Sequence, residues 1–357
     1  MFVTAVENFV LFGTLLALGG FATAWAARLF TLRGWWASYP LTLTRVYSLA
    51  ILLPPVAATW IVVAAYLPEW WLGEEAFDAT HPAPLHQLHL LSDLTAALEP
   101  RLAYATLAFA AAASAFAAWS SVRGYARVGR VVRRLEMGAA PPRPEQVEIV
   151  KTAAGRQRMS VGLVMSDCPL SFVWGFRSPK LVLSSGLLNA LTAEQLLGVI
   201  EHEAAHYRRR DNVVKLALSA ASYLSLAFPL SRLILRWRAE QVELLCDEVA
   251  AARTSAPLEI AEALVRVRRA GATVSAGPLV AASGFMPDGV KAFERRVHRL
   301  VSFADYLPSS RSEALARAPR AGALVSALLF ALTLLTVSTL APLAVHRAAE
   351  SVIRLLA

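Results

Sequence analysis

Cysteine and charge are both scarce in this chain. Two cysteines among 357 residues exclude a fold that is held together by disulfides. Only 17% of the residues are charged and 56% are hydrophobic, whereas disordered chains are poor in apolar residues. With a mean hydropathy of +0.48, the sequence predicts a membrane protein and not a soluble chain of two domains.

Four segments lack charged residues over the length that a membrane-spanning helix requires. About 20 mainly apolar residues cross a bilayer, and only a helix satisfies their backbone groups there. We therefore expect transmembrane helices at residues 8–27, 46–67, 102–122 and 321–345. The first is not expected to be a cleaved signal peptide, because the positive charges follow its apolar run.

Charge of one sign is missing from the loops between these spans. Residues 68–100 carry six acidic residues and no basic one, whereas residues 28–45 carry three arginines and no acid. Residues 123–320 hold 29 of the 35 basic residues. The positive-inside rule then places both termini and the acidic loop 68–100 outside the membrane, and residues 123–320 in the cytoplasm.

The chain is thus divided into three parts: residues 1–122 with three spans, a cytoplasmic domain at 123–320, and residues 321–357 with the fourth span and a short external tail. The middle part is long enough for a core of its own. We expect it to be α+β and mostly helical, with strands at 161–167 and 180–184 and helices at 239–254 and 257–270. An uncharged run at 216–231 predicts one membrane-associated helix at about 214–235, lying on the inner surface or packed on the spans.

A helix that begins after Thr192 carries the pattern His-Glu-x-x-His at residues 202–206. Its start is indicated by a capping box between Thr192 and Gln195. Residues four apart share one face of a helix, so His202 and His206 can bind one cation while Glu203 reaches a water molecule on it. Two histidines and one carboxylate are a typical donor set for catalytic zinc. The pattern predicts a hydrolase with one zinc ion per chain and Glu203 as its general base.

A second acidic helix follows 37 residues after His206 and can complete this site. Glu240, Glu243 and Asp247 share one of its faces. One of them can bind the metal while another orients a histidine. Asp211, five residues after His206, is a further carboxylate that we expect behind the ligands.

These motifs resemble those of the membrane zinc metallopeptidases of the BlaR/MecR type and, more distantly, those of the HtpX and CAAX-prenyl-protease peptidases. The likeness is carried by Cys168, Pro169, Gly175, Pro179, Leu183, Glu194, Gln195, the run HEAAHYRRRD and the run ELLCDE. It implies the metal ligands His202, His206 and Glu243, with Glu203 as general base and Asp247 as a carboxylate behind a ligand. Because BlaR/MecR receptors carry a large external β-lactam-binding domain after the fourth span and this chain ends at Ala357, the resemblance does not imply direct antibiotic sensing by this chain. Whether a separate sensor protein is a partner stays open.

Several other residues carry weaker expectations. Ser283, Gly284 and Phe285 lie in a loop that is a candidate for self-cleavage, although an ordinary connection is the simpler reading. The strand at 180–184 is a candidate edge for an extended substrate. Cys168 and Cys246 are expected to be buried and unoxidised. The candidates for oxyanion stabilisation are Tyr207, Arg253 and His298, and the outer-loop histidines His81, His86 and His89 are expected on a solvated helix.

The function expected from the sequence is a zinc endopeptidase that cleaves a repressor, another membrane protein or itself at the cytoplasmic face, in signal transduction. Its expected partners are a protein or peptide substrate and the bilayer; a separate sensor protein and a homo-oligomer are left open. Nucleic acid is not expected, because membrane orientation already explains the basic residues. One rival is a signalling scaffold of the same fold. A channel is the other, although no expected span contains a charged residue.

Overall fold

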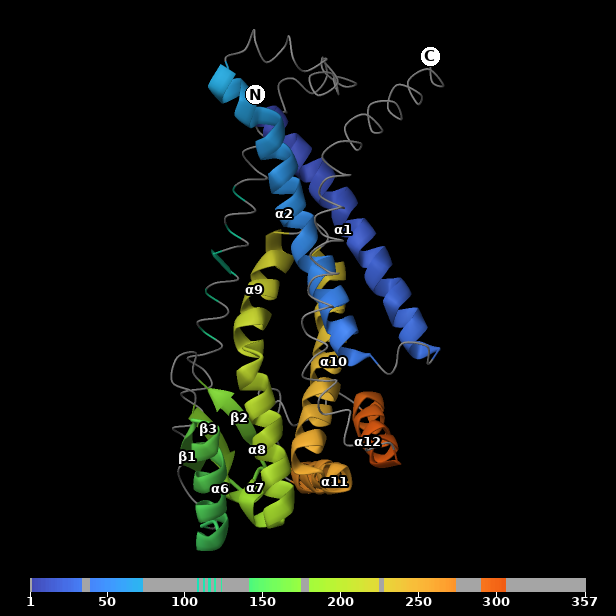
Figure 1. The fold of residues 1–357 in the computed structure, drawn as a ribbon. Helices are drawn as coiled ribbons and strands as arrows, with labels where there is room; N and C mark the ends of the chain where they lie inside the picture. Colours follow the sequence, from blue (N-terminus) through green and yellow to red (C-terminus); the bar gives the residue numbers. More distant parts are fainter. Residues whose placement is uncertain are drawn as a thin grey trace.

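The computed structural model describes residues 2–33, 39–72, 141–174, 180–224, 228–273 and 290–305, together with residues 108, 112, 115, 116, 119 and 123. Its helices are α1 (Phe2–Leu32), α2 (Pro40–Leu72), α6 (Pro144–Arg156), α7 (Ser185–Ala190), α8 (Ala193–Arg208), α9 (Asp211–Leu224), α10 (Phe228–Thr254), α11 (Pro257–Thr273) and α12 (Val290–Asp305). Its strands are β1 (Ser160–Val164), β2 (Ser171–Trp174) and β3 (Lys180–Ser184). Figure 1 shows α1 and α2 at one end of the molecule and the sheet at the other.

Helices α1 and α2 are each long and apolar enough to cross a membrane. Their apolar stretches are Gly13–Leu32 and Pro40–Trp60, and the spans expected at 8–27 and 46–67 fall inside these two helices. The six described residues between 108 and 123 are also helical, and Phe116 among them contacts Tyr223 of α9. The acidic loop from residue 73 to 100, the fourth span at 321–345 and the candidate self-cleavage loop at 283–285 lie outside the described residues.

Small residues allow α1 and α2 to pack closely. They recur every three or four residues on one face of α1, at Gly13, Ala17, Gly20, Ala24 and Ala27. Apolar side chains gain little by leaving lipid, so helices in a bilayer associate through close backbone packing at such faces. A pair of long apolar helices is therefore fixed by its glycines and alanines.

The closest approach between α1 and α2 is at Gly20. A Cβ atom on this residue would lie 2.6 Å from the carbonyl oxygen of Ala50. Pro54 follows Ala50 by four residues and has no N–H, so the Ala50 carbonyl has lost its helical donor. A Cα hydrogen of Gly20 faces this oxygen in its place, as a weak hydrogen-bond donor. Glycine is therefore required here by contact distance.

The expectation of one helix at about 214–235 was wrong, because the uncharged run is divided between two antiparallel helices. α9 ends at Leu224 and α10 begins at Phe228. Figure 1 shows the two helices side by side with α2. The hairpin contributes four residues to a buried cluster with α1 and α2: Leu218, Ala221, Ile234 and Trp237. Each arm buries an apolar face in this cluster. A single helix lying on the membrane surface would leave about half of that apolar surface uncovered.

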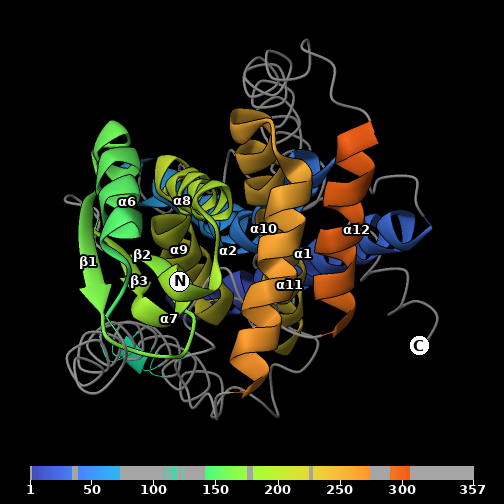
Figure 2. The same ribbon diagram turned by 90° about the horizontal axis from the view of Figure 1, so that it is seen from below.

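The sheet has three strands in the order β1-β3-β2. β1 is parallel to β3, and β2 is antiparallel to it. The strand expected at 180–184 is confirmed as β3, and the strand expected at 161–167 is shorter and ends at Val164. β2 was not predicted, since four residues are too few to show an alternating pattern. Seen from below in Figure 2, the sheet and α6 lie at one side, α12 lies at the other, and α8, α10 and α11 lie between them.

Helix α8 is fixed at both ends by local interactions. The expected capping box is confirmed, because the Thr192 hydroxyl accepts from the Gln195 N–H and the Gln195 side chain accepts from the Thr192 N–H. At the other end Arg210 adopts a left-handed conformation with φ 55°, and α9 begins at the next residue. α8 therefore leads directly into the hairpin formed by α9 and α10.

The helices expected at 239–254 and 257–270 lie within α10 and α11.

Replacing Gly20 with Ala should destabilise the α1–α2 pair. The added Cβ would push against the backbone of Ala50, and overpacking of this kind costs about 1–3 kcal/mol. The neighbouring Gly19 is the matched control, because a Cβ there meets nothing within 4 Å. We expect Gly20→Ala to lower the thermal unfolding midpoint of the detergent-solubilised protein and Gly19→Ala to leave it unchanged or raise it. Equal midpoints for the two variants would contradict this packing.

Candidate metal centre

Two imidazoles converge on the buried face of α8. His202 is fully buried and His206 is partly exposed, one helical turn further along. Their ring centroids are 4.9 Å apart and the two Nε2 atoms are 3.2 Å apart. The helix thus directs the same nitrogen of each ring toward one point, as the sequence spacing predicts.

A carboxylate from α10 meets both imidazoles. Oε2 of Glu243 lies 3.5 Å from Nε2 of His202, and Oε1 lies 3.5 Å from Nε2 of His206. One donor atom from each of these three residues lies within 4.8 Å of the others. We call His202, His206 and Glu243 the metal centre. Glu243 thus joins the two histidines, as the resemblance implies.

Glu240, which the spacing left as an alternative to Glu243, points elsewhere. Its Oε2 atom lies 2.9 Å from Nη1 of Arg28 on α1 and 2.9 Å from Nη2 of Arg295 on α12. These contacts join three helices. Glu240 therefore holds α10 between its neighbours and does not reach the metal centre.

Each histidine is oriented by a second carboxylate behind it. Nδ1 of His202 lies 2.9 Å from Oδ1 of Asp247, and Nδ1 of His206 lies 3.0 Å from Oδ2 of Asp211. A carboxylate at this distance holds the ring proton on Nδ1 and leaves the Nε2 lone pair available to a metal. The structure thus places both Asp247 and Asp211 where the sequence predicts them, one behind each ring.

The geometry of the three donors fits a tetrahedral zinc ion. Zinc–nitrogen bonds of about 2.0–2.1 Å at a tetrahedral angle put two nitrogens roughly 3.3 Å apart. The observed separations are 3.2 Å between the nitrogens and 3.5 Å from each to the carboxylate. Side-chain exposures of 17% for His206 and 22% for Glu243 leave one side of the centre accessible. A fourth position is therefore available to water or substrate.

The charges around the centre favour an added positive charge in its middle. Burial would lower the pKa of His202, but the carboxylates of Asp247 and Glu243 outweigh burial and raise its pKa to about 9. Burial likewise opposes ionisation of Asp247, yet the Arg296 guanidinium lowers the pKa of Asp247 to about 2. The carboxylates are therefore ionised, and they stabilise a cation bound at the imidazoles.

Arg296 on α12 holds the acidic face of α10, a role that the sequence analysis missed. Its Nε and Nη2 atoms donate to the two oxygens of Asp247 at 2.6 and 2.7 Å. Nη1 lies 3.2 Å from Oε2 of Glu243. Arg295 and Arg299 pair with Glu240 and Glu248 in the same way. The signal was present as a basic helical face facing an acidic one, but only the fold shows that the two helices meet.

Glu203 follows His202 in α8 and is held by the sheet. The side chain is buried, and its Oε1 atom accepts a 2.5 Å hydrogen bond from the hydroxyl of Ser171 at the start of β2. Ser171 was not predicted, because β2 itself was not. A carboxylate fixed in this way can exchange a proton with a water molecule at the open side of the centre.

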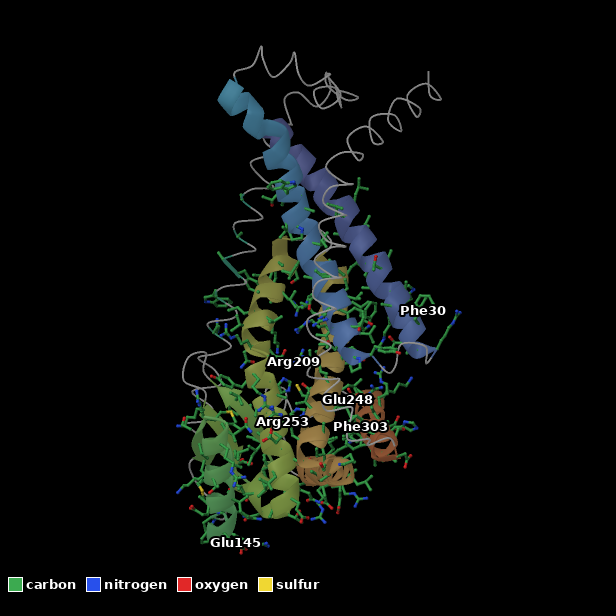
Figure 3. The ribbon with its side chains drawn as sticks, viewed as in Figure 1. Phe30, Glu145, Arg209, Glu248, Arg253 and Phe303 are labelled. Carbon is green, nitrogen blue, oxygen red and sulfur yellow. The ribbon has the colours of Figure 1, made fainter. Side chains whose placement is uncertain are left out.

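The structure gives the other nominated residues contacts or positions of a different kind. Arg253 pairs with Glu201 at the far end of α10, where Figure 3 labels it. Tyr207 packs against the main hydrophobic core, and His298 is exposed on α12. Cys168 and Cys246 are both buried free thiols, as expected. Cys246 contacts Asp211, and burial raises the pKa of the Cys246 thiol well above its usual range.

Comparisons with known proteins agree with this geometry. Residues 145–270 match the profile of Peptidase family M48, which includes the metal centre and leaves out α12. The chain is similar to proteins named "Protease HtpX homolog". They include those of Acidiphilium cryptum (36% identical over 111 residues, 30% of this chain and 38% of the relative) and Persephonella marina (32% over 109 residues, 30% and 37%). The chain thus spans less than two fifths of the length of these relatives. The matches support the HtpX part of the resemblance, and the likeness to BlaR/MecR receptors stays a prediction.

Replacing Arg296 with Gln should destabilise the fold strongly. The change leaves the buried Asp247 carboxylate without its guanidinium, and removing one partner of a buried ion pair costs about 3–5 kcal/mol. Arg266→Gln on α11 is the control, since Arg266 and its partner Glu262 are both exposed and pairs of this kind contribute about 0–1 kcal/mol. Urea unfolding of the two variants measures the difference. An unchanged midpoint for Arg296→Gln would show that Asp247 does not depend on this contact.

Proposed function

We propose that this chain is an integral-membrane, zinc-dependent endopeptidase. The observation that carries the proposal is the convergence of His202, His206 and Glu243 with the buried Glu203 beside them. The M48 profile and the similarity to HtpX homologues support it independently. Two histidines and one carboxylate are the donor set of several zinc peptidases.

In this proposal Glu203 transfers the proton of the reaction. A bound zinc ion would supply a Lewis acid and lower the pKa of a water molecule toward about 7. Glu203 accepts a proton from the attacking water while the oxygen of this water forms a bond to the peptide carbonyl carbon. The same proton then goes to the amide nitrogen, the carbon–nitrogen bond breaks, and a carboxylate and an amine leave. Asp247 and Asp211 keep the two imidazoles in the orientation that these reaction steps require.

The substrate is proposed to lie along β2. The sequence analysis suggested the strand at 180–184 as the edge, but this suggestion was wrong, because β3 is paired on both sides. Ser184 on β3 donates its N–H to the carbonyl of Leu170, so in the alternating antiparallel pattern Ser171 and Val173 direct their backbone groups away from β3. Asn212 already donates to the carbonyl of Val173. An extended peptide could pair with the remaining groups next to Glu203.

The membrane arrangement extends the same proposal. We place both termini and the acidic loop at 68–100 outside the bacterial inner membrane, and the metal centre in the cytoplasm. The support is the charge distribution along the sequence and the two long apolar helices. Its cellular role would be regulated cleavage of a repressor, a membrane protein or the chain itself, with a separate sensor protein supplying the stimulus.

Replacing Glu203 with Gln tests the enzymatic reading. Gln has nearly the same shape but cannot accept the proton, so cleavage should fall by about 10²–10⁴-fold while zinc stays bound. The measurements are elemental analysis of the purified protein and a comparison of protein N-termini in cells that carry the intact chain or the variant. N-termini found only with the intact chain would identify substrates. If the two cell populations share all N-termini and signalling persists, the scaffold alternative is correct.

Replacing Ser171 with Ala should lower turnover without preventing zinc binding. Glu203 would lose the donor that fixes its Oε1 atom, and one hydrogen bond to a charged group is worth about 1.5–3 kcal/mol. We expect kcat to fall by roughly 10-fold or more while KM changes little, since the Ser171 backbone that would pair with substrate is kept. Ser171→Thr retains the hydroxyl and should restore much of the rate. A change confined to KM would assign Ser171 to substrate binding instead.

A further inference from the structure

The hairpin arm α10 connects the apolar helices with the metal centre, and a buried arginine lies between them. Trp237 on this arm contacts Phe21 and Trp25 of α1 and Tyr47 of α2. The same helix provides Glu243 about two turns later and Asp247 about three turns later. Arg238 is next to Trp237 in sequence and is only 6% exposed. A charged side chain at such a depth needs partners on every side that it faces.

Arg238 has partners on both sides. Its Nε atom donates to the hydroxyl of Ser48 on α2 at 2.9 Å. Its Nη2 atom lies 3.9 Å from Oδ1 of Asp211. The other oxygen of Asp211 accepts from Nδ1 of His206 at 3.0 Å. A continuous polar chain therefore runs from α2 through Arg238 and Asp211 to a ligand of the metal centre.

The second arginine at Asp211 cannot play the same part. Nε of Arg209 lies 3.2 Å from Oδ2 of Asp211. Arg209 is two residues away in the same turn, at the junction of α8 and α9, where Figure 3 labels it. It therefore moves with Asp211 and neutralises its charge wherever that carboxylate lies. Arg238 comes from another helix, and it alone of these two fixes Asp211 relative to α2.

We infer that Arg238 is a positioning residue that couples the orientation of His206 to the seating of α10 against α2. Ser48 on α2 accepts a hydrogen bond from the Arg238 guanidinium. The positive charge of this guanidinium in turn orients the Asp211 carboxylate toward the His206 ring. Displacement of α2 relative to the hairpin therefore changes the metal affinity of the centre. The inference rests on the proposed function, because it requires that His206 bind zinc.

The test measures zinc affinity of the full-length chain in detergent micelles by competition with a coloured chelator. Four proteins are compared: the wild type, Arg238→Gln, Ser48→Ala and the control Arg236→Gln. Arg236 is exposed and lies two residues from Arg238 on the same helix. Its replacement by Gln removes the same charge as Arg238→Gln. Changes behind a metal ligand typically weaken affinity about 10–100-fold. We expect a loss near the lower end of this range for Arg238→Gln, a smaller loss for Ser48→Ala, and none for Arg236→Gln.

A double variant separates positioning from general loosening of the fold. If Ser48 acts only through Arg238, Ser48→Ala should weaken zinc binding in the wild type and have no further effect in Arg238→Gln. Additive losses in the double variant would overturn the inference. The thermal midpoint of each zinc-free protein is recorded beside its affinity, and a positioning role predicts affinity losses larger than the melting shifts explain. Should Arg238→Gln fail to fold, the milder Ser48→Ala decides alone, and an unchanged zinc affinity then overturns the inference.

The outcomes distinguish this inference from the proposed function. If the wild-type protein binds no zinc, the proposed function fails and the coupling has nothing to act on. If the wild type binds zinc and Arg238→Gln binds it equally well, the peptidase proposal stands and the inference is wrong. A shift in kcat with unchanged KM in the zinc-saturated Arg238→Gln protein would further place the effect at the metal centre and not at the substrate edge.

Discussion

The pairing of Arg296 with the acidic face of α10 is the interaction on which the metal centre depends. Asp247 is buried, and without a positive partner its charge would be neutralised or the helix displaced. Arg296 satisfies both of its oxygens and reaches Glu243 with the third nitrogen. A buried ion pair adds little stability over an apolar pair, but a buried carboxylate that has lost its partner is strongly destabilising. Here Arg296 holds the Asp247 carboxylate behind the His202 ring and the Glu243 carboxylate in front of both imidazoles.

The two sides of the centre are built on one plan. Behind His202 stands Asp247 with Arg296, and behind His206 stands Asp211 with Arg209 and Arg238. Each arginine keeps its aspartate ionised, and each aspartate holds its imidazole with the lone pair facing inward. The difference lies in where the arginines come from. Arg296 belongs to α12, whereas Arg238 contacts Ser48 on α2, so the two rings are oriented from different parts of the molecule.

Local patterns in the sequence carried the prediction wherever the interaction is local. Thr192 and Gln195 cap α8 within one turn, and His202 and His206 share a face of one helix, so spacing alone places them. The shared face of Glu243 and Asp247 follows from the same periodicity. Ser171 and Arg296 could not be found in this way, because each acts across a tertiary contact between elements far apart in sequence. Spacing alone left Glu240 and Glu243 as alternatives, and the structure separates them, because Glu243 meets both imidazoles while Glu240 pairs with Arg28 and Arg295.

The division of the uncharged run into a hairpin also explains why the ligands are spaced as they are. A helix that crossed a bilayer once at 216–231 would put Glu243 on the side opposite to His202, and the run is too short to cross twice. In the structure α9 leads away from Asp211 for 14 residues, and α10 takes a similar number to return from Phe228 to Glu243. At 1.5 Å per residue each arm is about 20 Å long. Because the arms are nearly equal, the third ligand returns to the level of the second, and the length of the hairpin sets how far the metal centre lies from the end of α9 that packs along α2.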